Sequence, residues 1–195
     1  MTVVETDRLV LRRLTAADAP FLVRLLNDPA FLRYIGDRGV RTVADAEAYV
    51  RDGPVRSYAD HGFGLYLVEL KGGRVPVGLC GLLKREGLDD VDVGYALLPE
   101  YGARGYAVEA ARATLDYARD VLGLGRVVAL VTPGNTASTR LLAKLGMAFE
   151  RTLRLPGSDE DVELYATDRR PPAPSPAPSH VGTARPSGHR QIRGA

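Results

Sequence analysis

The stretch DVGYALLPEYGARGYAVEA, from Asp92 to Ala110, has the pattern of a strand, a glycine-containing turn and the start of a helix. At such a junction, unpaired backbone N–H groups and the positive end of the helix dipole point at one place in front of the helix. We expect Gly102 and Gly105 to adopt φ values closed to other residues, and Arg104 to add a charge that pairs with phosphate. The stretch predicts a site for a phosphate-bearing ligand, although an ordinary strand-to-helix turn has the same pattern.

Two common phosphate-binding motifs do not fit this sequence. A P-loop needs Gly-Lys-Ser or Gly-Lys-Thr, and neither occurs in the chain. A dinucleotide-binding fold has Gly-x-Gly-x-x-Gly in its first βα unit, whereas this turn lies past the midpoint and has only Gly-x-x-Gly. We therefore expect a phosphate-bearing cofactor bound by another architecture.

The composition predicts one soluble domain. The 195 residues, 45% of them hydrophobic, are enough for one well-packed core. No apolar run approaches the roughly 18 residues that cross a bilayer, and the first residues lack a basic region followed by an apolar one, so we expect a cytoplasmic protein without a membrane partner. Cys80 is the one cysteine and is expected to be a buried strand residue, and no metal site is expected.

The end of the chain differs from the rest. Residues 170–195 are rich in Pro, Ala and Ser, contain four arginines and no acid, and are predicted to be a disordered tail. Without them the formal charge of +2 becomes −2, so the folded part is not expected to bind nucleic acid. Only His61 of the three histidines falls before the tail, which argues against a Ser-His-Asp triad or a multi-histidine metal site.

The hydrophobic periodicity predicts a mixed α/β domain over residues 1–169, with about six to seven strands. Thr15 with Asp18 and Thr42 with Asp45 have the spacing of helix-capping boxes. The strand before the glycine turn, the helix after it and the next apolar strand form one βαβ unit with parallel strands. The expected strands span residues 8–13, 64–70, 75–84, 90–98, 126–131, 147–153 and 162–166, and the expected helices span 16–26, 43–51, 106–122 and 136–145.

Four segments, in this order and at compatible spacing, resemble the GNAT family of N-acetyltransferases, and more narrowly its RimJ/RimL-type branch, which acetylates ribosomal-protein N-termini. They are Thr6 to Asp18, Asn27-Asp28-Pro29, Val93 to Ala110, and Asn135 to Met147. The resemblance covers about residues 5–168. It implies a three-layer fold with a mixed, mostly antiparallel sheet and a central βαβ unit that binds acetyl-CoA.

The resemblance also implies which positions hold this cosubstrate. Main-chain N–H groups hold the CoA pyrophosphate, Asn135 meets the cofactor or simply caps its helix, and a main-chain N–H of Leu97 or Leu98 stabilises the thioester oxygen. The pyrophosphate-binding residues would be Ala103, Arg104, Gly105, Tyr106 and Ala107. Two departures from the family pattern, Gly102 and Ala103, are expected to tune affinity, because the contacts come from the main chain.

Transfer to an amine requires removal of its proton, since a lysine-like amine has a pKa near 10.4. Asp92 is the first candidate for this base, because relatives often carry a Glu at its position, and Glu100 is the second. The tyrosine acid of the wider family is replaced by Leu142. Ser138 is the candidate that protonates the leaving thiolate, directly or through water, and it has an alternative role as a helix-start residue.

The acceptor is expected to be a primary amine, attacked directly in a ternary complex without an acyl-enzyme. Protein N-termini, an antibiotic amine and a small metabolite remain open, as do the monomeric and homodimeric states. Specificity is expected to come from the acidic loop 156–161 and from the region of Phe31, Tyr34, Ile35 and Tyr58. The alternatives are a catalytically silent acyl-CoA sensor with this fold and a nucleotide-binding protein.

Overall fold

The computed structural model describes residues 1–167, so the predicted tail at 170–195 lies outside the described residues. The strands are β1 (Thr2–Glu5), β2 (Leu9–Arg13), β3 (Leu65–Leu70), β4 (Val75–Leu83), β5 (Val91–Leu97), β6 (Val127–Val131), β7 (Ala148–Arg154) and β8 (Asp161–Ala166). The helices are α1 (Ala19–Leu26), α2 (Pro29–Tyr34), α3 (Val43–Val50), α4 (Arg56–His61), α5 (Tyr106–Asp120) and α6 (Thr136–Lys144), with helical turns η1 (Ala16–Asp18), η2 (Arg51–Val55) and η3 (Pro99–Tyr101).

The strands form one sheet in the order β1-β2-β3-β4-β5-β6-β8-β7, in which only β5 and β6 are parallel neighbours. The mixed, mostly antiparallel sheet and its βαβ unit are confirmed. The sheet has eight strands, one more than the sequence analysis expected. The additional strand is β1, whose four residues are too short for a periodic pattern and are held by antiparallel pairing with β2.

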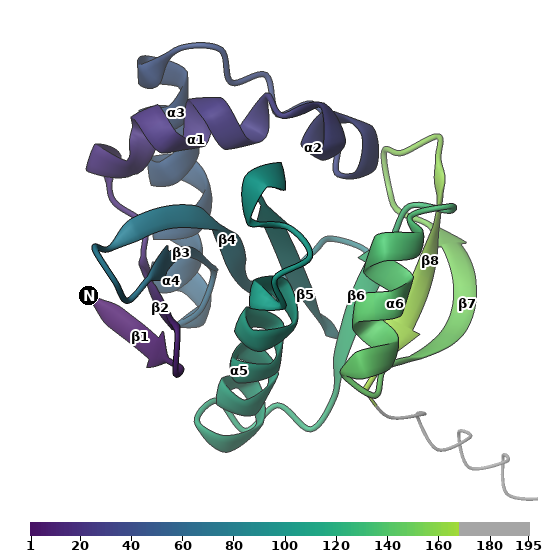
Figure 1. Cartoon of the computed structure of the whole chain (residues 1–195). Coiled ribbons are helices and arrows are strands. Elements are labelled where there is room, and N and C mark those ends of the chain that lie inside the picture. The colour runs from purple at the N-terminus through teal and green to yellow at the C-terminus, as the bar shows by residue number, and fades with distance from the viewer. Residues whose placement is uncertain (168–195) are drawn as a thin grey trace, which may run out of the picture.

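Helices cover both faces of the sheet, and two hydrophobic clusters lie beneath them (Figure 1). On one face Ala110 and Ala111 of α5 and Leu142 of α6 pack on the strands. On the other face α1 and α3 pack on Leu67 and Leu79. Successive side chains of β5 point alternately to these two faces, as they do in any strand, so β5 contributes to both clusters.

The predicted helix starts are partly right. Thr42 and Asp45 form the expected capping box, in which each side chain accepts a hydrogen bond from the other residue's backbone N–H. The first predicted helix ends at Leu26, as the sequence analysis expects, and a further helix that it did not expect, α2, begins at Pro29. Asp28 caps α2 by accepting a hydrogen bond from Ala30 N at 2.9 Å, and proline is well suited to a first helical position.

The divergence of β5 and β6 gives the fold its central opening. The two strands pair only at Val91 with Val127 and at Asp92 with Val128, although β5 continues to Leu97 and β6 to Val131. Beyond these pairs β5 keeps its antiparallel partner β4, and β6 keeps β8. The sheet is therefore continuous at one end of these strands and open at the other.

The close packing of strands at Gly81 gives a stability prediction. A Cβ atom at Gly81 would lie 2.2 Å from the Gly64 carbonyl oxygen and 2.7 Å from Leu65 Cα. We expect Gly81→Ala to lower the free energy of unfolding by about 3 kcal/mol, because backbone must move to make room. Gly125→Ala is the matched control, since nothing lies within 4 Å of its added Cβ. Denaturant unfolding measures both variants, and equal stabilities would contradict the proposed packing.

Candidate active site

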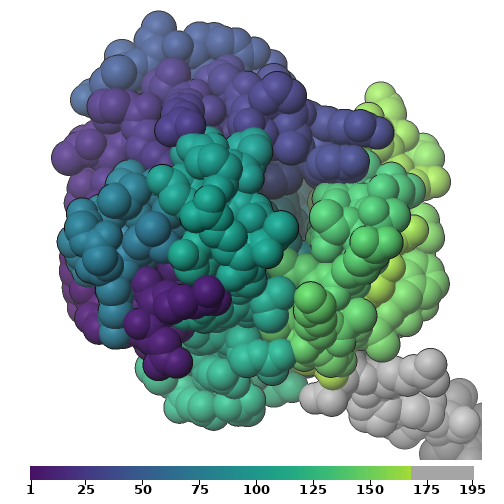
Figure 2. Space-filling model, in the orientation of Figure 1, coloured from purple at the N-terminus to yellow at the C-terminus, as the bar shows by residue number. Residues whose placement is uncertain are grey.

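A cavity of about 1140 Å³ occupies the opening between β5 and β6. Its walls come from the diverging strands (residues 92–97 and 129–132), from the turn before α5, and from α6. Residues of α2 and α3 and of the β4–β5 and β7–β8 loops extend it to the other face of the sheet. Figure 2 shows a hollow between the teal region near residue 105 and the green α6, beneath the violet α2.

The turn before α5 presents a row of free backbone donors. The N–H groups of residues 103–108 have no hydrogen-bond partner among the described residues. Gly105 has φ +80° and Ala103 has φ +56°, so the left-handed conformation falls on these two residues. The expectation for Gly102 is wrong, because its φ is −64° and its N–H donates to the Pro99 carbonyl. The side chain of Arg104 is absent from the cavity lining.

The first turn of α6 faces this row across the cavity. Asn135 Oδ1 accepts a hydrogen bond from Ser138 N at 3.1 Å, which confirms the helix-cap interpretation, and Asn135 also lines the cavity. The Ser138 hydroxyl lies 2.7 Å from the Tyr95 hydroxyl. Leu142, at the position of the family's tyrosine, is fully buried in the core. The Ser138 and Tyr95 hydroxyls therefore form a pair at this wall of the cavity.

Tyr95 is a site residue that the sequence analysis missed. It belongs to β5 and packs on the face that α5 and α6 cover. Burial raises the pKa of Tyr95 to about 12, so its hydroxyl stays protonated at neutral pH. The available signal was the two-residue period of β5, which places Tyr95 on the same face as Val93 and Leu97.

Asp92 lies on the opposite face, where β5 and β6 separate. Its side chain is 2% exposed, its Oδ2 accepts a hydrogen bond from Arg85 Nε at 2.5 Å, and its Oδ1 accepts one from Leu130 N at 3.3 Å. Burial raises the pKa of Asp92 above its usual value, while Arg85 and the Leu130 N–H oppose the shift. Arg85 was not a sequence candidate, because nothing in a loop sequence identifies its partner.

Glu100 lies apart from this group. It belongs to η3, is absent from the cavity lining and forms an ion pair with Arg24 of α1. Both side chains of this pair are exposed to solvent. The structure therefore brings Asp92, Tyr95 and Ser138 to one cavity and leaves Glu100 outside it.

The two expected main-chain donors of β5 are not equivalent. The Leu98 N–H donates to the Val77 carbonyl at 2.9 Å, so it is already engaged. Leu97 is opposite Gly78 in the neighbouring, non-hydrogen-bonded pair, in which the N–H groups point away from the partner strand. The Leu97 N–H therefore points toward the opening between β5 and β6.

Of the residues expected to contact the acceptor, some line the cavity and one does not. Phe31, Tyr34 and Ile35 line the cavity, as do Ser158 and Glu160 of the acidic loop. The expectation for Tyr58 is wrong: it is buried in the core, where its hydroxyl donates to the Leu65 carbonyl and accepts from Leu14 N.

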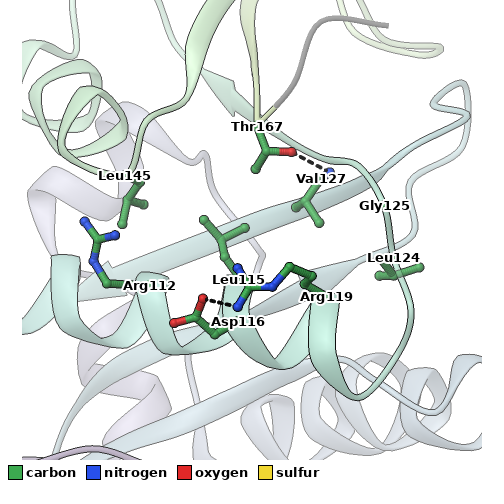
Figure 3. A pocket seen from close by; sticks show the side chains of 9 residues that line it. All are labelled: Arg112, Leu115, Asp116, Arg119, Leu124, Gly125, Val127, Leu145 and Thr167. Atoms are coloured by element: carbon green, nitrogen blue, oxygen red, sulfur yellow. Dashed lines mark hydrogen bonds and ion pairs between the residues drawn. The ribbon is translucent and has the colours of Figure 1, made fainter.

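A second, smaller cavity of about 210 Å³ lies beside the C-terminal half of α5 (Figure 3). Its arginines are engaged, since Arg119 pairs with Asp116 and Arg112 donates to the Lys144 carbonyl. Within residues 1–167, no cluster of His, Cys, Asp and Glu has the arrangement of a metal site.

Residues 8–148 match the acetyltransferase (GNAT) domain family. The chain belongs to the GNAT acetyltransferase family. This membership confirms the resemblance found in the sequence and shows that the chain is an acetyltransferase. The chain is 33% identical over 156 residues to the uncharacterised protein YkkB of Bacillus subtilis, an alignment that covers 78% of this acetyltransferase and 89% of YkkB.

Solved structures share the fold of this acetyltransferase. A GNAT-family acetyltransferase from Bacillus anthracis has a TM-score of 0.70 and 30% identity, over 85% of this chain and 97% of that one. RimL, a ribosomal L7/L12 α-N-protein acetyltransferase solved in complex with coenzyme A, has a TM-score of 0.71 and 20% identity, over 86% of this chain and 100% of RimL. The comparison with RimL shows that this chain shares its fold with an acetyltransferase that acts on a ribosomal protein.

The left-handed turn gives a prediction for Ala103. An alanine at φ +56° is strained, and glycine removes that strain at a smaller entropic cost. We expect Ala103→Gly to raise the free energy of unfolding by up to about 1 kcal/mol, and Gly105→Ala at φ +80° to lower it by about 1 kcal/mol or more. Thermal or denaturant unfolding measures both, and a destabilised Ala103→Gly protein would show that strain at Ala103 does not control this turn.

Proposed function

We propose that this acetyltransferase moves the acetyl group of acetyl-CoA to a primary amine, by direct attack of the amine in a ternary complex. The observation that carries the proposal is the opening between β5 and β6. It has free backbone donors at residues 103–108 on one side and the buried carboxylate of Asp92 on the other. A silent sensor would share the first feature, and Asp92 would then serve structure alone, through its hydrogen bonds with Arg85 and Leu130 N.

The cavity fits CoA through donors that this chain supplies. The N–H groups of residues 103–107 and the N-terminus of the 15-residue helix α5 would hold the pyrophosphate. Arg140 and Lys144 of α6 line the same half of the cavity and would add positive charge. When bound, acetyl-CoA supplies an activated acyl group whose thioester the amine attacks.

Asp92 is the proposed base. A carboxylate takes a proton more readily when burial has raised its pKa, because the deprotonated form is then less stable. Its position on the α1–α3 face lets an amine approach from the half of the cavity opposite α5. The amine that loses its proton to Asp92, directly or through water, is then neutral and nucleophilic.

Two other groups complete the proposed chemistry. The Leu97 N–H points into the opening and would stabilise negative charge on the thioester oxygen. The Ser138 hydroxyl would donate a proton to the departing thiolate, and Tyr95 would hold Ser138 in place through their 2.7 Å contact.

Direct attack is favoured over an acyl-enzyme by the state of the nucleophilic side chains. Cys80 is fully buried, and burial raises the pKa of its thiol to about 12, so a thiolate is not formed at neutral pH. Ser138 has Tyr95 as its side-chain neighbour, and a protonated phenol cannot act as its base. The described residues thus offer no activated nucleophile in this cavity.

Other expectations stay predictions. These are the cytoplasmic location, the monomeric or homodimeric state, the absence of nucleic-acid and membrane partners, and the domain boundary at residue 169. Among residues 1–167, none of the helices has the length and apolar character that a membrane span requires.

The cosubstrate is tested by calorimetric titration of the full chain. We expect micromolar binding of acetyl-CoA and CoA and at least tenfold weaker binding of ATP and NAD. Pantetheine, which lacks all phosphates, should bind at least about a hundredfold more weakly, because the donors at residues 103–107 then have no acceptor. Equal affinity for ATP or NAD would favour the nucleotide-binding alternative, and failure to bind CoA would overturn the proposal.

The pH dependence of turnover separates the enzyme from the sensor. Asp92 must be deprotonated to act, and burial raises its pKa, so kcat/KM should fall on the acidic side at a pH above the ordinary Asp value of about 3.9. We expect Asp92→Asn to lower kcat by about 10²- to 10³-fold and to remove this acidic limb. Ser138→Ala should lower kcat by about tenfold and keep the limb, because a thiolate leaves without strict need of an acid.

Binding of acetyl-CoA by the two variants serves as the control for their structure. Acetyl-CoA titration of each shows whether the cavity remains formed. If Asp92→Asn binds acetyl-CoA normally and retains both its rate and its acidic limb, Asp92 is not the base. If neither the unchanged chain nor the variants acetylate any amine while acetyl-CoA binds, the sensor alternative holds.

A further inference from the structure

The half of the cavity on the acceptor side is rich in positive charge. Its basic lining residues are Arg33, Arg38, Lys84 and Arg85, and its acidic ones are Asp92 and Glu160. An amine is itself a cation before it loses its proton. A purely cationic acceptor would therefore be repelled by the walls of the site that must bind it.

Three of these basic side chains have no acidic partner within the described part of the chain, and two of them, Arg33 and Arg38, are only weakly engaged. Arg85 pairs with Asp92, and Lys84 Nζ donates to the carbonyls of Leu88 and Asp89. Arg33 lies over the ring of Tyr34 and forms no ion pair. Arg38 makes one long hydrogen bond, 3.4 Å to the Ile35 carbonyl.

Most of the arginines within residues 1–167 pair with a carboxylate. The arginines that pair with a carboxylate are Arg8, Arg12, Arg24, Arg41, Arg51, Arg56, Arg74, Arg85, Arg119, Arg126, Arg151 and Arg154. Arg41 is instructive, because it lies only three residues from Arg38, is held by Asp37 and is absent from the cavity lining. The guanidinium groups of Arg33 and Arg38, at the mouth of the cavity, are therefore available to a ligand.

Tyr49 of α3 adds a donor at the same place. Its hydroxyl has no hydrogen-bond partner among the described residues, and it lines the cavity. Burial raises the pKa of Tyr49, whereas the charges of Arg38 and Arg85, which line the same cavity, oppose that shift. The phenol stays protonated and remains a donor. Arg38, Arg85 and Tyr49 therefore line one cavity, and among the described residues only Arg85 has a carboxylate partner.

We propose that the acceptor is a small zwitterionic amine, one that carries a carboxylate or phosphate group, and that Arg38 and Tyr49 bind this group while the amine faces Asp92. The inference rests on the proposed function, since it names the substrate class of that site. Planar guanidinium groups bind both anions through paired hydrogen bonds. Neutralising Arg38 with an anion lets the amine enter a basic cavity, and Asp92 and Glu160 remain to attract it.

Matched pairs of amines test the inference with the full chain and saturating acetyl-CoA, by release of free thiol. One pair is β-alanine and β-alanine amide, which probes the carboxylate; the other is O-phosphoethanolamine and ethanolamine, which probes the phosphate. We expect the anionic member of at least one pair to have a kcat/KM about tenfold or more above its neutral partner, mainly through KM. The pair that shows the preference distinguishes carboxylate from phosphate.

Substitutions then assign the preference to its residues. Arg38→Gln should reduce the ratio of kcat/KM between the two members to about one, and Tyr49→Phe should reduce it partly. Arg41→Gln is the matched control and should leave the ratio unchanged, because Arg41 lies outside the cavity. Arg38 is exposed at the cavity mouth, so its replacement is not expected to disturb folding.

The outcomes separate this inference from the proposed function. Lack of acetyl-CoA binding would remove the proposed function itself. With acetyl-CoA bound, equal or faster turnover of the neutral amines, or a preference that survives Arg38→Gln, would overturn the zwitterionic acceptor alone. Turnover of none of these amines would also overturn it. The amidated peptide Ser-Ala-Ala represents a protein N-terminus, and its preferential turnover would overturn the inference as well.

Discussion

The site depends on the early end of the pairing between β5 and β6. Two residue pairs join these parallel strands, and the Asp92 carboxylate then takes the Leu130 N–H that a longer ladder would have used. Buried backbone donors must find acceptors, so the side chain of Asp92 stabilises the point where the strands part. Arg85 in turn compensates the buried charge. Removing either group is expected to affect the shape of the cavity as well as its chemistry.

The alternation of side chains along β5 gives the opening two chemically distinct halves. Tyr95 faces α5 and α6, where Ser138 and the free N–H groups at residues 103–108 lie. Asp92 faces the other side, toward α2, α3 and the β4–β5 loop. The strand β5 therefore carries both Tyr95, which contacts the proposed proton donor Ser138, and Asp92, the proposed base. Acetyl-CoA and the amine could therefore enter from opposite halves and be bound at the same time, which is what a ternary complex requires.

Charge is distributed differently in these halves. On the α5 side, main-chain N–H groups and the helix N-terminus provide partial positive charge. This charge does not depend on which side chains the turn carries. This explains how the pattern tolerates Gly102 and Ala103, even though Ala103 adopts a strained conformation. On the acceptor side, the charge comes from side chains in loops, Arg38 and Arg85 among them, and we propose that these determine which amine is accepted.

The sequence by itself determined the βαβ unit, the mixed sheet and the glycine-containing turn before α5, because apolar periodicity and glycine spacing act locally along the chain. It named Asp92 and Ser138, which both line the cavity, but it also named Glu100, which does not, and Tyr58, which is buried in the core. It also overlooked β1, which only its pairing with β2 defines. The tertiary structure alone decided that Tyr95 meets Ser138, that Arg85 pairs with Asp92, and that Glu100 is held by Arg24 outside the cavity. These contacts join residues from separate elements, and their distances depend on how strands and helices pack, which no local pattern encodes.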